Sequence, residues 1–125
     1  MKERLLKTTV AKYQEATWTG TNTSEWAPVG GRVVVLPDSA EQVTQGGIEI
    51  PMDVVARHTM ASEAGVLIAI GPLAFAEYEI KPQPGDRVYI ERFAGQLLPG
   101  YDGKVYRLMD YQCIGAVMKK EQVNG

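Results

Sequence analysis

Short runs rich in valine, isoleucine and tyrosine follow one another from residue 26 onward, and they limit the possible folds more than any other feature of the chain. The runs cover residues 32–36, 65–70, 87–93, 104–109 and 112–118. Apolar residues alternate within them, so Val66, Ile68 and Ile70 are expected on one face, as are Val88 and Ile90. With no helical pattern between the runs, the sequence predicts an all-β domain, either a small barrel or a sandwich.

Turn residues punctuate these runs. Residues 84–86, Pro-Gly-Asp, predict a turn that opens strand 87–93. Residues 99–103, Pro-Gly-Tyr-Asp-Gly, predict a second turn, which would make 104–109 the hairpin partner of the preceding run, 87–93. Asp110 and Tyr111 are interpreted as a tight link into the last strand.

The two ends of the chain differ from this β region. Leu6, Val10 and Tyr13 fall at helical spacing, and residues 19–24 are rich in Thr, Ser, Asn and Gly. Residues 1–25 are therefore expected to form an N-terminal extension, helical or partly disordered, whose removal leaves the barrel folded. The β domain is expected at 26–119 and a C-terminal tail at 120–125.

A long polar segment, residues 37–63, separates the first two runs and is predicted to be a mobile loop. In its middle stand Gly46, Gly47, Ile48, Glu49, Ile50 and Pro51. The glycines give backbone freedom, and in an extended strand the two isoleucines point to the same side. This pattern favours a hook for an apolar groove on another protein. The alternative is an ordinary surface hairpin with two half-buried isoleucines.

Charge and composition exclude several classes of protein. The 125 residues are the size of one domain, with 13 basic and 15 acidic side chains and a net charge of −2. This balance argues against a nucleic-acid binder, although the β region carries tyrosines that an OB-type barrel would use for stacking. The single cysteine excludes an intrachain disulfide framework and favours a reducing compartment. We find no membrane span and no secretion signal.

Catalytic patterns are largely missing. Because His58 is the only histidine and Cys113 the only cysteine, a site built on several such ligands is impossible. A Cys–His pair is formally possible, but His58 falls in the expected loop and Cys113 is interpreted as a small buried residue of the last strand. No nucleophile elbow, phosphate loop or dinucleotide fingerprint occurs. The sequence therefore predicts no enzyme, no catalytic residue, no metal and no cofactor.

Taken in order, the motifs from residue 26 to 118 resemble those of one family, the GroES-like co-chaperonins (chaperonin-10 family). Residues 27–35 resemble its opening Pro-Leu-x-Asp-Arg-Val segment, and residues 46–51 stand where the family has Gly-Gly-Ile-hydrophobic-Leu-Pro in its mobile loop. Later segments resemble its remaining strands, namely 64–71, 84–90, 93–95 and 111–117.

The resemblance implies a small GroES-like β-barrel subunit of a heptameric ring in the cytoplasm. Such a ring caps a nucleotide-bound chaperonin-60-type cylinder, with the nucleotide on the partner, and encloses a client protein. Residues 46–51 would bind the chaperonin. The resemblance also implies that the opening segment around residues 26–29 pairs with the C-terminal strand of a neighbouring subunit and so closes the ring. The residues implied at this interface are Trp26, Pro28, Val29, Ile114, Ala116 and Val117.

Three departures from the family pattern stand out. Glu49 replaces an apolar residue of the loop, and the extension 1–25 is additional. The segment 71–86 is shorter than usual, and its roof region, 72–84, lacks a glycine-rich hairpin tip. The expected roof residues are Leu73, Phe75 and Tyr78. These departures resemble those of phage-encoded co-chaperonins, which would place the protein in a host cytoplasm.

Two other functions were weighed. The same barrel could serve as a virion structural or assembly protein, with the loop docking elsewhere. Dehydrogenases of the alcohol type also contain a GroES-like domain, but they add a nucleotide-binding domain and usually zinc ligands, neither of which this sequence shows.

Overall fold

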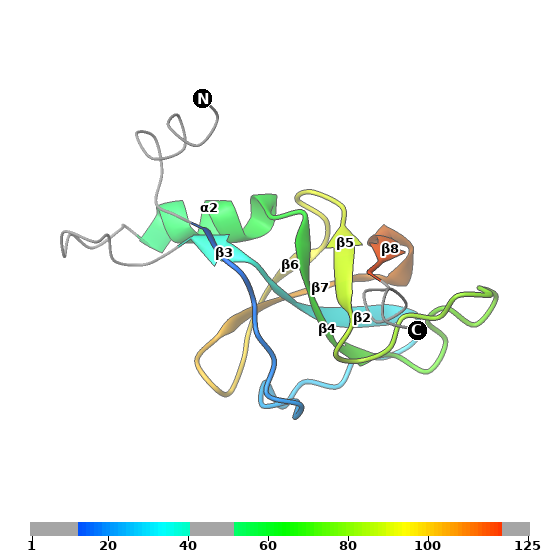
Figure 1. The fold of residues 1–125 in the computed structure, drawn as a ribbon. Helices are drawn as coiled ribbons and strands as arrows, with labels where there is room; N and C mark the ends of the chain where they lie inside the picture. Colours follow the sequence, from blue (N-terminus) through cyan, green and yellow to red (C-terminus); the bar gives the residue numbers. More distant parts are fainter. Residues whose placement is uncertain (1–12, 41–51, 119–125) are drawn as a thin grey trace, which may run out of the picture.

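A computed structural model describes residues 13–40 and 52–118 of the chain (Figure 1). The described elements are β1 (Tyr13–Gln14), β2 (Arg32–Pro37), β3 (Ser39–Ala40), α2 (Met52–Ala61), β4 (Ala64–Ile70), β5 (Arg87–Ile90), β6 (Gln96–Pro99), β7 (Val105–Asp110), the 3₁₀ helix η1 (Tyr111–Cys113) and β8 (Ile114–Val117). Six of the strands form one antiparallel sheet in the order β6-β7-β2-β4-β5-β8, and β1 pairs with β3 apart from it. The prediction of an all-β domain is confirmed.

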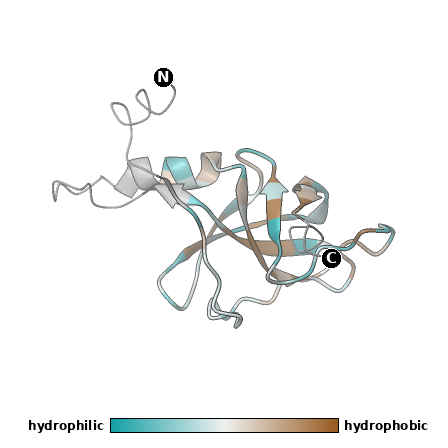
Figure 2. Ribbon diagram, in the orientation of Figure 1, coloured by the Kyte–Doolittle hydropathy of each residue, from teal (hydrophilic) through white to brown (hydrophobic). Residues whose placement is uncertain are grey.

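The sheet curls around an apolar core. Met109 of β7 and Ile114 of β8 belong to the same buried cluster, although several strands separate β7 from β8 in the sheet. This is possible only if the sheet bends so that its two sides approach each other. Phe75, from the segment between β4 and β5, fills the same core and is 1% exposed. Figure 2 shows the hydrophobic residues following the strands.

A second apolar cluster lies on the other face of the sheet. It is built from Val34, Val66, Ile68 and Tyr106, and Trp18 packs against it. The central strand β2 is therefore apolar on both faces, which explains its unbroken run of valines. The sheet needs a cover on this second face, and the N-terminal part of the chain supplies it.

A bulge changes one predicted face. Val34 lies opposite Ala69, whereas Val35 lies opposite Leu67, so β4 carries one extra residue at this point. Val66 and Ile68 face the second cluster, but Ile70 packs against the core inside the curl. The prediction that all three share a face is wrong for Ile70. The shared face of Val88 and Ile90 is confirmed.

The predicted hairpin partner of 104–109 is also corrected. Strand β7 pairs with β6, in a register that joins Pro99 to Val105, and β6 had not been predicted. Gln96 to Pro99 is too short and mixed to show a clear alternation. The tight link at the end of β7 is confirmed, because the Asp110 side chain accepts a hydrogen bond from the Gln112 amide and caps η1.

The expected helical character of the N-terminal extension is wrong for residues 13 and 14, which form strand β1. Residues 13–26, called the arm below, run across the sheet in Figure 1. Ser24 is 1% exposed, and the Trp18 indole donates a hydrogen bond to the Thr21 carbonyl at 3.0 Å. A two-residue strand gives no periodic signal, so local sequence could not show this pairing. Residues 1–12 lie outside the described part.

The predicted loop 37–63 contains regular structure as well. Strand β3 follows β2 almost directly, and α2 occupies residues 52–61 beside β3. Ala56, Met60 and Ala61 are good helix formers, whereas the polar composition of the surrounding segment suggested a loop. Residues 41–51, which hold the predicted hook, lie outside the described residues.

Candidate partner-binding surfaces

The segment that connects β2 to β4 leaves the sheet and returns to it at adjacent positions. Pro37 lies opposite Gly65, and the Asp38 amide donates to the Ala64 carbonyl at 3.0 Å. A Cβ atom on Gly65 would come within 2.5 Å of the Leu36 carbonyl oxygen, so only glycine allows this close approach. The segment between β2 and β4 therefore leaves and rejoins the sheet at one narrow site, formed by residues 37–38 and 64–65 and called the base below.

The outgoing side of this base is fixed by an ion pair. Arg87 of β5 donates to both carboxylate oxygens of Asp38, at 3.1 and 2.6 Å. The Ala16 amide of the arm donates to Asp38 Oδ1 at 2.8 Å. The hydrogen bond to Asp38 raises the pKa of Arg87, and burial opposes that rise. Glu15 adds a second, exposed carboxylate 3.4 Å from Arg87 Nε.

The returning side of the base is fixed by a buried guanidinium. Arg107 of β7 is 0% exposed and donates to the carbonyls of Ser62, Glu91 and Ala94 over 2.8 to 3.3 Å. Burial lowers its pKa. The Phe93 amide also donates to the Met60 carbonyl, near the end of α2, at 2.8 Å. The last turn of α2 is thereby tied to the sheet and to residues 91–95.

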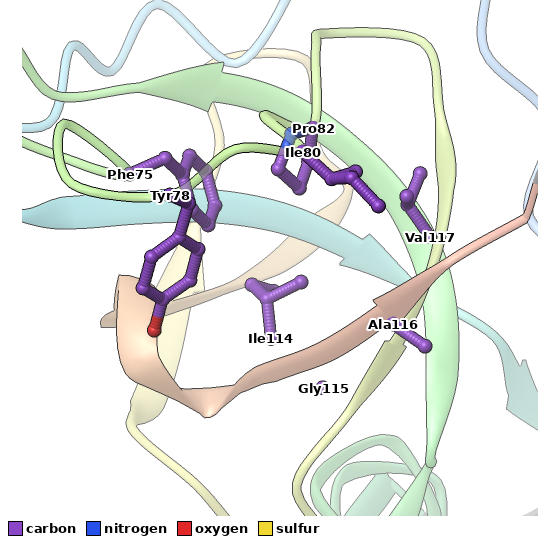
Figure 3. Close-up of a pocket in the computed structure, with 8 residues that line it drawn as sticks. All are labelled: Phe75, Tyr78, Ile80, Pro82, Ile114, Gly115, Ala116 and Val117. Atoms are coloured by element: carbon purple, nitrogen blue, oxygen red, sulfur yellow. The ribbon is translucent and has the colours of Figure 1, made fainter.

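The edge strand β8 borders an apolar pocket of about 380 Å³. One wall comes from the segment between β4 and β5, and the other from β8, with Ile114 and Val117 directed toward it (Figure 3). The lining residues are Phe75, Tyr78, Ile80, Pro82, Ile114, Gly115, Ala116 and Val117. The structure therefore brings the predicted interface residues of β8 together with two of the predicted roof residues.

The other half of the predicted interface lies at the end of the arm. Val29 is 75% exposed and Pro28 is half-buried. Trp26 is engaged within its own chain, because its indole donates to the Pro99 carbonyl at 2.7 Å and its carbonyl accepts from the Asn22 side chain at 2.8 Å. Its amide donates to Ser24 Oγ at 3.1 Å.

The segment 71–86 is compact. Within these residues, all of which the structure describes, the chain makes turns and no strand. Lys81 Nζ donates to the carbonyls of Phe75, Ala76 and Tyr78 at 3.0, 3.0 and 2.7 Å and so closes the turn. Of the predicted roof residues, Phe75 belongs to the core, Tyr78 packs against it, and only Leu73 is largely exposed, at 66%.

No group of three or more acidic, histidine or cysteine side chains placed to hold a metal occurs among residues 13–40 and 52–118. Cys113 lies at the end of η1 and not on the last strand, where it had been predicted; it is partly buried against the core, and burial raises the pKa of its thiol. In the part of the chain that is described, no helix has the length and apolar character needed to cross a membrane.

Sequence reasoning missed the residues that fix the base. Asp38 falls in a polar segment, and Arg87 and Arg107 alternate with apolar residues, so the local sequence predicts exposed positions for all three. Arg107 follows Tyr106 on β7, and both are buried, which simple alternation cannot predict. The one available signal was the position of Asp38 directly after an apolar strand.

Comparison with known proteins identifies the class of protein to which this fold and these surfaces belong. Residues 25–118 match the model of the family described as "Chaperonin 10 Kd subunit". The chain therefore belongs to the chaperonin-10 family, the GroES-like co-chaperonins, which is a family of folding co-factors and not of enzymes.

Individual relatives are bacterial proteins named "Co-chaperonin GroES". The protein of Streptomyces griseus is 30% identical over 96 residues, covering 74% of this chain and 89% of the relative. That of Acetivibrio thermocellus is 30% identical over 95 residues, covering 74% and 96%. That of Treponema denticola is 38% identical over 68 residues, covering 54% and 69%. These matches support the co-chaperonin function, and they give no support to the virion-assembly alternative.

Proposed function

We propose that the protein assembles into a ring, a heptamer by analogy with its family, and caps a chaperonin-60-type cylinder in a nucleotide-dependent way while a client protein folds inside. The observation that carries this proposal is the family match over residues 25–118, which spans the barrel and the position of the hook. The names of the relatives agree with it.

Residues 46–51 are the proposed chaperonin-binding segment. Burying Ile48 and Ile50 contributes about 3–6 kcal/mol. Ordering about five residues of backbone costs about 5–10 kcal/mol, so a single loop binds weakly. Several loops on one ring bind together through their high effective concentration. Glu49 points away from the two isoleucines in an extended strand, which leaves their apolar side intact.

The proposed subunit interface joins two surfaces, namely the edge strand β8 with its pocket and the segment at residues 26–29 of a neighbouring copy. Strand β8 ends the sheet and has no further strand beside it among the described residues. An uncovered edge next to an apolar pocket suits pairing with residues 27–29 of a neighbouring copy, which would cover both. Trp26 would then act within its own subunit by holding this segment against Pro99. A phage origin stays a prediction.

Size-exclusion chromatography with a bacterial chaperonin, with and without ADP or ATP, tests the proposed function. We expect co-elution that depends on nucleotide. The double variant Ile48→Ser/Ile50→Ser should lose co-elution while its own ring mass is unchanged, because the six-stranded sheet and the pocket beside β8 are built from other residues. Normal binding by this variant would show that residues 46–51 are not the hook. A wild-type ring that never co-elutes would overturn the lid function itself.

A further inference from the structure

One carboxylate joins three parts of the chain at the base of the loop. Asp38 directly follows β2. It accepts two hydrogen bonds from Arg87 of β5 and a third from the Ala16 amide of the arm. Its side chain is 16% exposed, and that of Arg87 is 25% exposed. Charge-assisted bonds that are partly shielded from water hold their geometry better than an exposed ion pair.

The arm continues from this junction along the start of the loop. Tyr13 lies opposite Ala40 and Gln14 opposite Ser39, in the antiparallel pair β1–β3. Two residues on each side make a pair that is too short to persist alone. Ala16, whose amide donates to Asp38, lies two residues after β1. Its hydrogen bond therefore holds the arm close to the place where β1 pairs with β3.

The pairing of β1 with β3 also holds residues 39 and 40 from a second side. Residues 39 and 40 are held on the arm by β1 and on the sheet by Asp38, whereas a loop without an arm would be fixed only at the sheet. A segment whose base is fixed at more points has fewer states to lose when it binds.

We propose that Asp38 is a positioning residue for partner binding: by holding the arm against the outgoing strand, it directs the segment that follows Ala40, so the arm is part of the partner-binding device. This inference rests on the proposed function. In a ring, a small loss at each loop multiplies over all loops, so a modest change per subunit produces a large change in apparent affinity.

The test compares three variants of the full chain by their apparent affinity for a bacterial chaperonin in ADP. Asp38→Ala removes the whole junction, whereas Ala16→Pro removes the donated amide and keeps both members of the Asp38–Arg87 pair in the chain. Thr23→Val is the matched control, because it also removes one arm-to-barrel hydrogen bond, from Thr23 Oγ1 to Asp102 at 2.6 Å, but away from the loop base. Hydrogen exchange of the Ser39 and Ala40 amides in the free ring is the second measurement.

We expect Asp38→Ala and Ala16→Pro to weaken apparent affinity by about tenfold or more at unchanged ring mass. We also expect faster exchange at residues 39 and 40, with both quantities near wild type in Thr23→Val. If Asp38→Ala fails to fold, Ala16→Pro decides the question. A wild-type ring that binds while Ala16→Pro binds equally well would overturn the inference alone. Equal losses in Thr23→Val would assign the effect to general stability and would also overturn it.

Discussion

Tyr106 shows how a single buried side chain links the arm, a hairpin and the sheet. It is 2% exposed in the second cluster, and its hydroxyl donates to Asp102, which also accepts from Thr23 of the arm. Burial, together with the hydrogen bond to Asp102, raises the pKa of Tyr106 to about 12. The phenol therefore stays protonated in the folded protein at pH values where an unfolded tyrosine, with a pKa of about 10, ionises.

This difference predicts a loss of stability at high pH. Because the folded pKa is raised, the contribution of Tyr106 is fully present below pH of about 10 and disappears as the pH rises toward 12. Urea unfolding of wild type and Tyr106→Phe at several pH values measures it. The wild type should lose more free energy of unfolding than the variant between pH of about 9 and 11.5. Parallel pH curves for the two proteins would show that Tyr106 is not the cause.

Buried residues of the sheet show which positions can be predicted from sequence and which cannot. The pair Val88 and Ile90 was placed correctly, because residues two apart on a strand share a face of the sheet. Ile70 was misplaced because a bulge adds one residue to β4 and reverses the faces beyond it. The burial of Arg107 could not be predicted, because the carbonyls that it binds come from two distant segments, at Ser62 and in the turn at residues 91–94, and no local pattern encodes such a set.

At the scale of elements, the arm is part of the folded domain. Trp18 covers the second cluster and also lies over Gly85, where an added Cβ would come within 2.9 Å of the indole. Gly85 has a φ of +100°, so the turn before β5 requires glycine for its backbone as well as for this contact. These contacts argue against the expectation that the extension is dispensable for folding, which remains to be tested for residues 13–26.

Truncation tests the role of the arm. Deleting residues 1–23 should lower the free energy of unfolding by about 3 kcal/mol or more, because it removes Trp18 and uncovers apolar surface on the sheet. Deleting residues 1–12 is the control, since all the arm contacts described here remain. Chemical unfolding of both truncated proteins gives the comparison. Equal stability of the two would mean that the arm does not contribute to the core.

Strands could be predicted where their own residues show an apolar alternation. The longer strands were found within one or two residues of their ends. Strands β1 and β3 were missed because two residues give no periodicity, and β6 because its four residues lack β-branched or aromatic side chains. The hook was proposed from its residues and from the family resemblance, and its conformation lies outside the described part.

For the whole molecule, the proposed ring depends on the edge strand β8. Ala116 is exposed on this strand and lines the apolar pocket, so an arginine there should leave the subunit folded but prevent a neighbour from packing. We expect Ala116→Arg to be a folded monomer with no measurable chaperonin binding, because separate loops lose their shared effective concentration. Tyr101→Arg, at an 86% exposed hairpin tip, should remain a ring. Light scattering and circular dichroism distinguish these outcomes, and a ring formed by Ala116→Arg would refute the interface.

The contacts of the arm have a consequence for the order in which a newly made chain acquires its structure. Thr23 and Trp26 leave the ribosome early, yet their partners Asp102 and Pro99 are 79 and 73 residues further along the chain. The arm must therefore wait for these contacts until nearly the whole domain has emerged. Contacts this distant in sequence form slowly, and until they form, one apolar face of the nascent sheet stays open to water and to other chains. In this folding co-factor the arm is thus among the last parts of the domain to make its native contacts.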